Sequence, residues 1–206
     1  MDKGYRIIKN AFSTELLDKV NRDFENVALC FSDTDVFRTQ NGDVKQIQNC
    51  QVLDVFKEIA DHIKNICPFD VEVMNMQYFI KHPNYKITAP HQDGAYFDDI
   101  DSDIYTFWIP LHPVNVETST MFYYDWDGTR EILPHENVGT NVRSRTGKVG
   151  YSQYTSIYPL DEFKPVILDY GDCVVHNQFS THYSNENSTD KPRIAITCIL
   201  KINNNK

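Results

Sequence analysis

The sequence predicts a mainly β member of the α+β class, a double-stranded β-helix (a cupin-like jelly roll) with N-terminal helices packed on one face. Helical periodicity is confined to the first third of the chain. From residue 70 onward, short runs rich in Val, Ile, Tyr, Phe and Thr alternate with clusters of Gly, Pro, Asn and Asp. Closely spaced strands that follow two helices are typical of a barrel or of two packed sheets.

The length and composition suit one domain. The chain has 206 residues, of which 41% are hydrophobic, and no repeat or linker divides it. We therefore predict a single domain over 1–206, with a helical part at about 1–68, a jelly-roll core at about 70–201 and a lid or insertion at about 125–163.

Two helices are expected in the N-terminal part. Ser13 is a good N-cap residue, and Phe12 and Leu17 stand at the positions of a hydrophobic staple around it, so a helix is expected to run from there to about residue 28. Apolar residues recur at helical spacing over 51–65, and Pro68 follows that stretch. This pattern predicts the second helix.

The strands of the core are expected in the β-branched and aromatic runs, at 71–81, 105–111, 120–124, 166–170, 173–176 and 193–201. The stretch 125–163 shows no clear strand periodicity, and it gathers the basic residues Arg143, Arg145 and Lys148 in an otherwise acidic chain. Long irregular segments in a compact domain are often active-site covers, so we predict a partly ordered lid here.

Charge and cysteine content exclude several classes of protein. The net charge is −9 and no run of Lys or Arg is present, which argues against a nucleic-acid partner. No apolar segment follows the N-terminus, which argues against a signal peptide or a membrane span. The five cysteines are odd in number and widely spread, which favours reduced thiols in a cytoplasmic protein over a disulfide scaffold or a zinc ribbon. The sequence does not distinguish a monomer from a homodimer.

The segment Pro90-His91-Gln92-Asp93-Gly94 carries a candidate metal site. On an extended chain, residues i and i+2 point to the same side, so His91 and Asp93 can bind one ion. A second histidine from a distant strand would complete a two-histidine, one-carboxylate face, which leaves positions open for a co-substrate and O₂. A single His-x-Asp motif is often no more than a loop histidine beside an aspartate. Further residues of the sequence are therefore needed to show whether this one binds a metal.

The C-terminal part supplies the context. His182 and Ser184 share one face of an expected strand, 185–191 looks like a turn, and folding this hairpin about its middle puts Arg193 opposite His182. A guanidinium beside the metal can form a bidentate pair with a carboxylate, as a 2-oxoglutarate site requires. His176 competes with His182 as the third ligand, but a strand histidine without such partners is more often a core residue, so His182 is favoured.

These motifs resemble the phytanoyl-CoA dioxygenase family of Fe(II)/2-oxoglutarate-dependent oxygenases over roughly residues 70–201. The matching pieces are Phe79-Ile80-Lys81 leading into His91-Gln92-Asp93, then Trp108, Gly171-Asp172, and His182-x-Ser184 with Arg193. The resemblance implies that His91, Asp93 and His182 are the catalytic iron ligands and that Arg193 binds the distal carboxylate of 2-oxoglutarate. It also implies that Ser184, Gln92 and Trp108 line the co-substrate pocket and that Gln77 occupies a further contact position.

The implied activity is hydroxylation of a C–H bond in a small-molecule substrate, with Fe(II), 2-oxoglutarate and O₂, and with release of succinate and CO₂. The family's usual Pro-Gly-Ser-His segment is replaced by Met121-Phe122-Tyr123-Tyr124-Asp125-Trp126-Asp127, so the substrate does not carry over. The basic residues of the predicted lid form either a solvated loop face, which is the favoured interpretation, or a binding site for an anionic group of the substrate. The alternatives are desaturation or cyclisation on the same residues, and a non-catalytic jelly-roll protein that binds a metal or small molecule. A cupin-type isomerase would have no use for Arg193.

Overall fold

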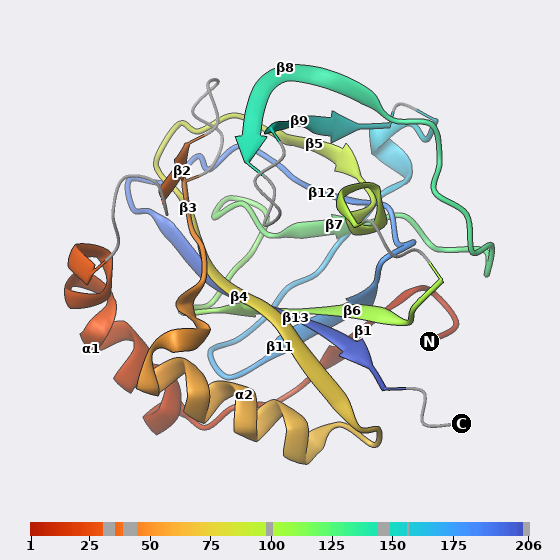
Figure 1. Ribbon diagram of the computed structural model, residues 1–206. Helices are drawn as coiled ribbons and strands as arrows, with labels where there is room; N and C mark the ends of the chain where they lie inside the picture. Colours follow the sequence, from red (N-terminus) through yellow and green to blue (C-terminus); the bar gives the residue numbers. More distant parts are fainter. Residues whose placement is uncertain (31–35, 39–44, 98–100, 144–148, 156, 204–206) are drawn as a thin grey trace.

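The computed structural model describes residues 1–30, 36–38, 45–97, 101–143, 149–155 and 157–203, and its main feature is a pair of antiparallel sheets (Figure 1). The larger sheet has seven strands in the order β1-β11-β6-β13-β4-β3-β2. Their bounds are Tyr5–Ile8 (β1), Cys173–Asn177 (β11), Ile104–Pro110 (β6), Arg193–Ile202 (β13), Val71–Lys81 (β4), Lys45–Ile47 (β3) and Val36–Arg38 (β2).

The smaller sheet has four strands in the order β10-β7-β12-β5, and a separate hairpin pairs β8 with β9. The bounds are Lys164–Pro165 (β10), Met121–Tyr123 (β7), His182–Ser184 (β12), Thr88–His91 (β5), Glu136–Arg143 (β8) and Val149–Tyr154 (β9). The inner faces of the two sheets meet in an apolar cluster that includes Trp108 and Val174 from the larger sheet and Met121 and Tyr123 from the smaller one. The predicted jelly-roll class is therefore confirmed.

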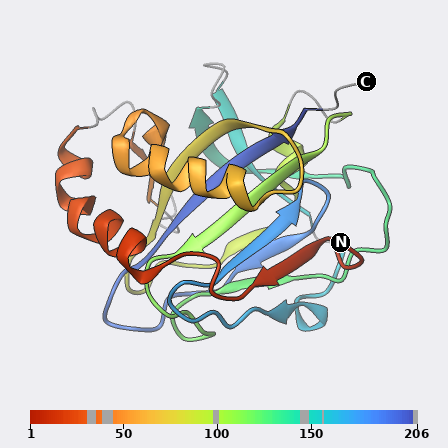
Figure 2. The same cartoon turned by 90° about the horizontal axis from the view of Figure 1, so that it is seen from below.

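Helices α1 (Thr14–Cys30) and α2 (Asp54–Ile66) cover the outer face of the larger sheet (Figure 2). The Ser13 hydroxyl accepts a hydrogen bond from the Leu16 amide at 3.2 Å, which confirms the predicted N-cap. The apolar stripe of α2 is buried against β4, where Phe56 packs edge-on against Tyr78. Among the described residues, no helix is both long and apolar enough to span a bilayer.

The two central strands of the larger sheet, β4 and β13, separate an apolar layer from a polar one. Residues such as Tyr78 and Ile196 point outward into the core beneath the helices. The alternate residues point toward the smaller sheet, and four of them are polar and buried: Gln77, Lys81, Arg193 and Thr197. Buried polar groups of this kind are costly unless they meet a partner, so this inner face marks a place where a ligand is expected.

Several predicted elements differ from the observed ones. The second helix begins at Asp54 rather than at 51, because a short 3-10 turn, η1 (Cys50–Val52), precedes it and Leu53 is extended. The expected strand at 166–170 is reduced to one isolated bridge between Leu168 and Val114, since the regular ladder ends at β10. The short strands β1, β2, β3, β5, β8 and β9 were not predicted. The hairpin β8–β9 in particular lies where we expected an irregular segment.

The turn before β11 requires a glycine. Gly171 has φ of +100°, and a Cβ at this position would lie 2.9 Å from the carbonyl oxygen of Phe12. The Phe12 amide donates a hydrogen bond to the Gly171 carbonyl oxygen at 2.9 Å, and this bond holds the segment before α1 against the turn. A side chain at position 171 would therefore strain the backbone and push the two segments apart.

Replacing Asp172 by asparagine is expected to lower the free energy of unfolding at pH 7 by about 1–3 kcal/mol, because its buried carboxylate accepts three hydrogen bonds. The donors are Lys9 Nζ at 2.6 Å, Asp169 N at 2.8 Å and Asn10 N at 2.9 Å. Burial raises the pKa of the Asp172 carboxyl, but these hydrogen bonds outweigh it and leave the pKa below its ordinary value.

A carboxyl whose pKa is lower in the folded than in the unfolded protein stabilises the fold above the unfolded-state pKa, at about 4. This contribution is lost as the pH falls through the folded-state pKa. Urea unfolding of both proteins between pH 7 and pH 3 should therefore show the difference in unfolding free energy shrinking at low pH. A difference that stays constant would contradict the prediction.

Candidate metal centre

Two neighbouring strands bring three predicted ligands together. Strand β5 ends at His91, the 3-10 turn η2 (Asp93–Tyr96) follows, and the extended Gln92 between them turns His91 and Asp93 to the same side. Strand β12 pairs with β5 so that His182 lies directly opposite His91. The ligand atoms of His91, Asp93 and His182 all lie within 4.8 Å of one another, close enough to hold one metal ion.

His91 and His182 both have Nε2 available to bind a metal, because Nδ1 is hydrogen-bonded to the backbone in each. His91 Nδ1 lies 2.8 Å from the carbonyl oxygen of Ala89, and His182 Nδ1 lies 2.9 Å from that of Ser180. A carbonyl oxygen only accepts, so each Nδ1 carries the proton and each Nε2 lone pair is free to face a metal. Burial, followed by the nearby rings of His176 and His91, lowers the pKa of His182 well below its usual value. His182 is therefore a neutral imidazole at physiological pH, as a metal ligand must be.

The larger sheet fixes the carboxylate of Asp93. Its Oδ2 accepts hydrogen bonds from Thr106 Oγ1 at 2.6 Å and from His176 Nε2 at 3.0 Å, and His176 Nδ1 in turn accepts from the Tyr123 hydroxyl at 2.9 Å. Its Oδ1 faces the two imidazoles, at 3.6 Å from His182 Nε2 and 3.8 Å from His91 Nε2. Burial raises the pKa of the Asp93 carboxyl, but the His176 hydrogen bond and the surrounding histidines outweigh it, so this pKa lies below its usual range. His176, the rival for third ligand, thus contacts a ligand instead.

Replacing His176 by alanine is expected to weaken iron binding by about 10- to 100-fold without abolishing it, because Asp93 loses one orienting donor and keeps Thr106. Tyr123→Phe removes only the hydroxyl that holds His176, and it should have a smaller effect in the same direction. Competition with a fluorescent metal chelator would measure both affinities. An unchanged iron affinity for His176→Ala, or its complete loss with the fold intact, would contradict this role.

Arg193, the predicted carboxylate clamp, lies on a different strand pair from the one that we expected. We expected β12 and β13 to form a hairpin with Arg193 opposite His182, and this is wrong: β12 lies in the smaller sheet, whereas β13 lies between β4 and β6 in the larger one. Arg193 instead pairs directly with Lys81 of the adjacent strand β4, and its guanidinium carbon lies 5.4 Å from the centre of the Trp108 ring. The guanidinium still enters the space between the sheets, from the sheet opposite His182.

Arg193 and Thr197 present buried donor groups on this inner face that an anionic ligand could accept. Arg193 is 2% exposed, donates from Nη1 to the Phe79 carbonyl oxygen at 3.3 Å, and has a buried Nε without a partner among the described residues. Burial lowers the pKa of Arg193 to about 10, so it remains a cation at neutral pH. Thr197 Oγ1, which can donate to an anion, is also buried without a partner in the described chain, as is Gln77 Oε1, which can only accept. A buried cation without a counter-ion is costly, so an anionic ligand is expected here.

A family model for phytanoyl-CoA dioxygenase (PhyH) matches residues 1–195. The chain belongs to the PhyH family. Its sheet topology and its His/Asp/His set are those of an Fe(II)/2-oxoglutarate-dependent oxygenase. The predicted family is thus confirmed. No curated protein matches the sequence.

Solved structures with the same fold include enzymes of several reaction types. The non-haem α-ketoglutarate-dependent epimerase SnoN from nogalamycin biosynthesis has a TM-score of 0.73 and 18% identity, covering 98% of this chain and 79% of that one. EvdO2 from Micromonospora carbonacea var. aurantiaca has a TM-score of 0.73 and 20% identity, with 98% and 87% coverage. The carbocyclase SnoK from nogalamycin biosynthesis has a TM-score of 0.69 and 16% identity, with 98% and 81% coverage. At these identities the likeness establishes the fold.

In this PhyH-family chain, Gln92 holds the segment that follows β7. Its Oε1 accepts from the Leu133 amide at 2.7 Å, and its Nε2 donates to the carbonyl oxygens of Phe179 at 2.7 Å and Glu131 at 3.2 Å. The Gln92 side chain points away from His91 and Asp93, as strand alternation requires. Its contact with the co-substrate therefore stays a prediction, whereas its contact with residues 131–133 is a feature of the structure.

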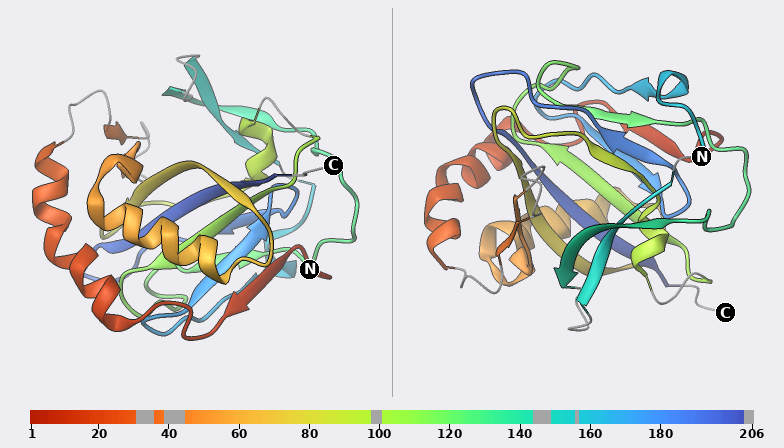
Figure 3. Two further views of the ribbon diagram at one scale, coloured as in Figure 1. Left: turned by 60° about the horizontal axis from the view of Figure 1, so that its bottom comes forward. Right: turned by 90° about the horizontal axis from the view of Figure 1, so that it is seen from above.

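The segment predicted as a lid lies beside the metal ligands. The hairpin β8–β9 crosses above β5 and η2 (Figure 3), and the Thr155 amide donates to the Pro90 carbonyl oxygen at 2.8 Å. Of the basic residues noted in this segment, Arg143 ends β8, while Arg145 and Lys148 lie outside the described residues. The backbone of the hairpin is thus in a position to cover His91.

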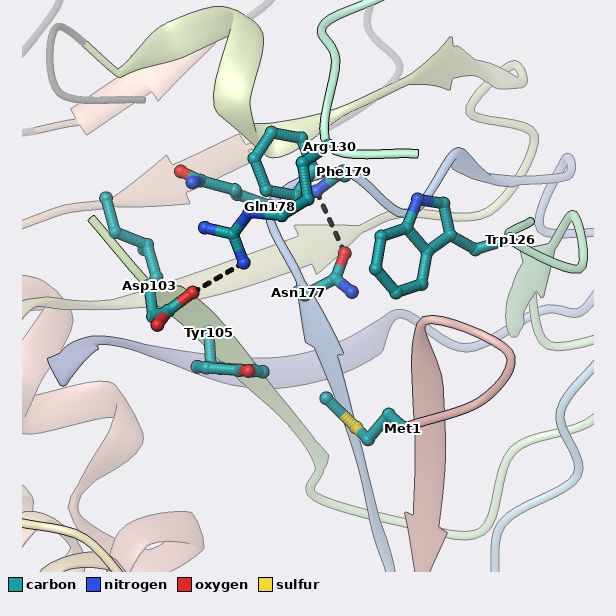
Figure 4. Close-up of a pocket in the computed structure, with 9 residues that line it drawn as sticks. Met1, Asp103, Tyr105, Trp126, Arg130, Asn177, Gln178 and Phe179 are labelled. Carbon is teal, nitrogen blue, oxygen red and sulfur yellow. Dashed lines mark hydrogen bonds and ion pairs between the residues drawn. The ribbon is translucent and has the colours of Figure 1, made fainter. Parts of the chain in front are cut away.

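A groove with a volume of about 180 Å³ lies near the N-terminus, beside Met1, Trp126 and the Arg130–Asp103 ion pair (Figure 4). It is distinct from the metal centre. The groove lies where β6 begins and β11 ends, with Ile104, Tyr105 and Asn177 in its lining, and none of the three ligands lines it.

Proposed function

We propose that this PhyH-family protein hydroxylates a C–H bond of a small molecule, consuming 2-oxoglutarate and O₂ at an Fe(II) ion and releasing succinate and CO₂. The observation that carries the proposal is the pairing of a three-ligand metal face with a buried arginine across the same intersheet space. Three protein ligands on one face leave the remaining coordination positions for the 2-oxo acid and O₂. A protein that only stored a metal would have no use for the arginine.

Each residue then has a defined task. His91, Asp93 and His182 hold the iron, which supplies the oxidative decarboxylation of 2-oxoglutarate and the oxidant for the substrate C–H bond. Arg193 binds the distal carboxylate of the 2-oxo acid, and the Trp108 ring packs against that guanidinium. Thr106 and His176 keep Asp93 in one orientation, so that a single carboxylate oxygen faces the metal.

Known structures with this fold support the choice of cofactor and co-substrate. SnoN has been crystallised in complex with Fe3+, α-ketoglutarate and nogalamycin RO, and EvdO2 has been crystallised with 2-oxoglutarate. Because SnoN is an epimerase and SnoK a carbocyclase, the outcome at the substrate has to be tested separately. With ¹⁸O₂, a hydroxylase places one labelled oxygen atom in its product, whereas epimerisation and ring closure place none.

The basic activity can be tested without knowing the substrate. Iron-reconstituted protein incubated with 2-oxoglutarate in air is expected to form succinate through uncoupled turnover, and omission of iron should stop it. Binding of iron and 2-oxoglutarate without any succinate would favour a non-catalytic binding protein.

The segment 125–163 is proposed to cover the iron and to select the substrate. Segments that close over a reactive site exclude water and belong to the less stable parts of a fold. Hydrogen exchange in β8 and β9 is therefore expected to slow when iron and a 2-oxoglutarate analogue are added, while exchange in β4 and β13 stays unchanged. Protection of the hairpin equal to that of the central strands in the ligand-free protein would contradict a covering role.

A further inference from the structure

Lys81 is a fully buried lysine at the end of β4, with its ammonium between the two sheets. Its Nζ donates to Ser184 Oγ at 3.0 Å, to the Ser184 carbonyl oxygen at 3.2 Å and to the Asn185 carbonyl oxygen at 2.6 Å. Thr88 Oγ1, on β5, lies at 3.3 Å. Lys81 belongs to the larger sheet and the other residues to the smaller sheet or its loop, so the ammonium joins the sheets at one end of the intersheet space.

The same end of the space holds the proposed carboxylate clamp. Lys81 and Arg193 are direct partners across the β4–β13 ladder, so their side chains leave the sheet on the same side, with Cβ atoms about 5 Å apart. Ser184 follows His182 by two residues on β12, which places it on the same face and about 7 Å further along the strand from the metal ligand. Two cations directly opposite each other repel, and an anion bound between them relieves this repulsion.

The hydrogen-bond balance of Ser184 points to a ligand. A serine hydroxyl has one hydrogen to donate and two lone pairs, whereas an ammonium can only donate. The contact with Lys81 therefore occupies a lone pair of Ser184 Oγ and leaves its hydrogen unused. No acceptor for that hydrogen is found among the described residues. Donation from a cation also makes a hydroxyl a stronger donor to the next group in the chain.

We propose that Lys81 is a positioning residue for the distal carboxylate of the 2-oxo acid: it directs the Ser184 hydroxyl toward that carboxylate and adds a second buried positive charge beside Arg193. The inference rests on the proposed function and specifies its co-substrate end. It assigns to Lys81 a part of the selectivity for a dianionic 2-oxo acid. Lys81 would add nothing to the binding affinity for 2-oxopentanoate, a five-carbon 2-oxo acid that lacks the distal carboxylate.

The test compares the binding of these two acids to the full chain loaded with Mn(II), which accepts the same nitrogen and oxygen ligands. Calorimetric titration would give both dissociation constants for the wild type, Lys81→Met and Lys81→Gln. We expect each variant to bind 2-oxoglutarate about 10- to 100-fold more weakly, because hydrogen bonds to a charged group are lost. Binding of 2-oxopentanoate should change by less than about twofold. If the variants bind both acids more weakly by the same factor, Lys81 has only a structural role and the proposal is wrong.

Ser184→Ala provides a second route that keeps Lys81 in place. It should also reduce the preference for 2-oxoglutarate over 2-oxopentanoate. The loss of 2-oxoglutarate binding free energy in the double variant with Lys81→Met should be smaller than the sum of the losses in the two single variants, because both residues act through one hydroxyl. If the lysine variants do not fold, an unchanged preference of Ser184→Ala for 2-oxoglutarate over 2-oxopentanoate would still overturn the proposal that Lys81 acts through the Ser184 hydroxyl. Failure of the proposed function looks different: the wild type itself would then bind no 2-oxoglutarate and form no succinate.

Discussion

Replacing His182 by alanine is expected to abolish iron-dependent succinate formation. His182 is one of three ligands, it is 3% exposed, and the described residues nearby offer no other free nitrogen at its position. A two-ligand site would lose most of its affinity and would no longer hold the metal in a facial arrangement. His91→Ala and Asp93→Ala should have the same effect.

The measurement is succinate by mass spectrometry together with bound iron by a colorimetric assay. His62→Ala is a matched control, because His62 lies on α2, where its ring contacts the Ala11 carbonyl oxygen at 2.7 Å, on the outer side of the larger sheet. This control should keep both its iron and its activity. A His182→Ala protein that retains both would show that the third ligand lies elsewhere.

Arg193→Ala is expected to raise the 2-oxoglutarate concentration needed for half-maximal turnover by about 30-fold or more. Truncating one partner of a buried, hydrogen-bonded charge pair typically costs about 2–5 kcal/mol. Iron affinity should change little, since the guanidinium lies on the opposite sheet from His91 and His182.

Arg193→Lys keeps a positive charge but loses the planar pair of donors, so it should fall between the wild type and Arg193→Ala. Titrating 2-oxoglutarate at saturating iron gives the apparent constants. The same dependence in all three proteins would remove Arg193 from the co-substrate site.

The features that could be predicted correctly from the sequence are those that depend only on residues close together in the chain. The His91-x-Asp93 pair depends only on the alternation of an extended chain, and the cap at Ser13 depends only on its neighbours. Strand β4 was predicted to its exact ends, because a run rich in Val, Tyr, Phe and Ile lies between the turn residues Pro68 and Asp70 on one side and Pro83 and Asn84 on the other.

The partners of strands could not be predicted in this way. Alternation tells which residues share a face, but it does not tell which strand lies alongside, so β12 and β13 were paired with each other although they belong to different sheets. The same limit hid the role of His176, which faces Asp93 from β11, and the burial of Lys81. The polar residues at alternate positions of β4 were the available signal, and only the second sheet explains why they are inside.

The metal face also joins the two layers of the molecule. Two of its ligands, His91 and His182, stand on the smaller sheet, while the carboxylate of Asp93 is hydrogen-bonded to Thr106 and His176 of the larger one. An ion bound to all three would act as a cross-link between the sheets, outside the covalent chain. Substitutions that shift one sheet against the other, even far from the iron, would then alter metal retention, and chelation would loosen the interior as a whole.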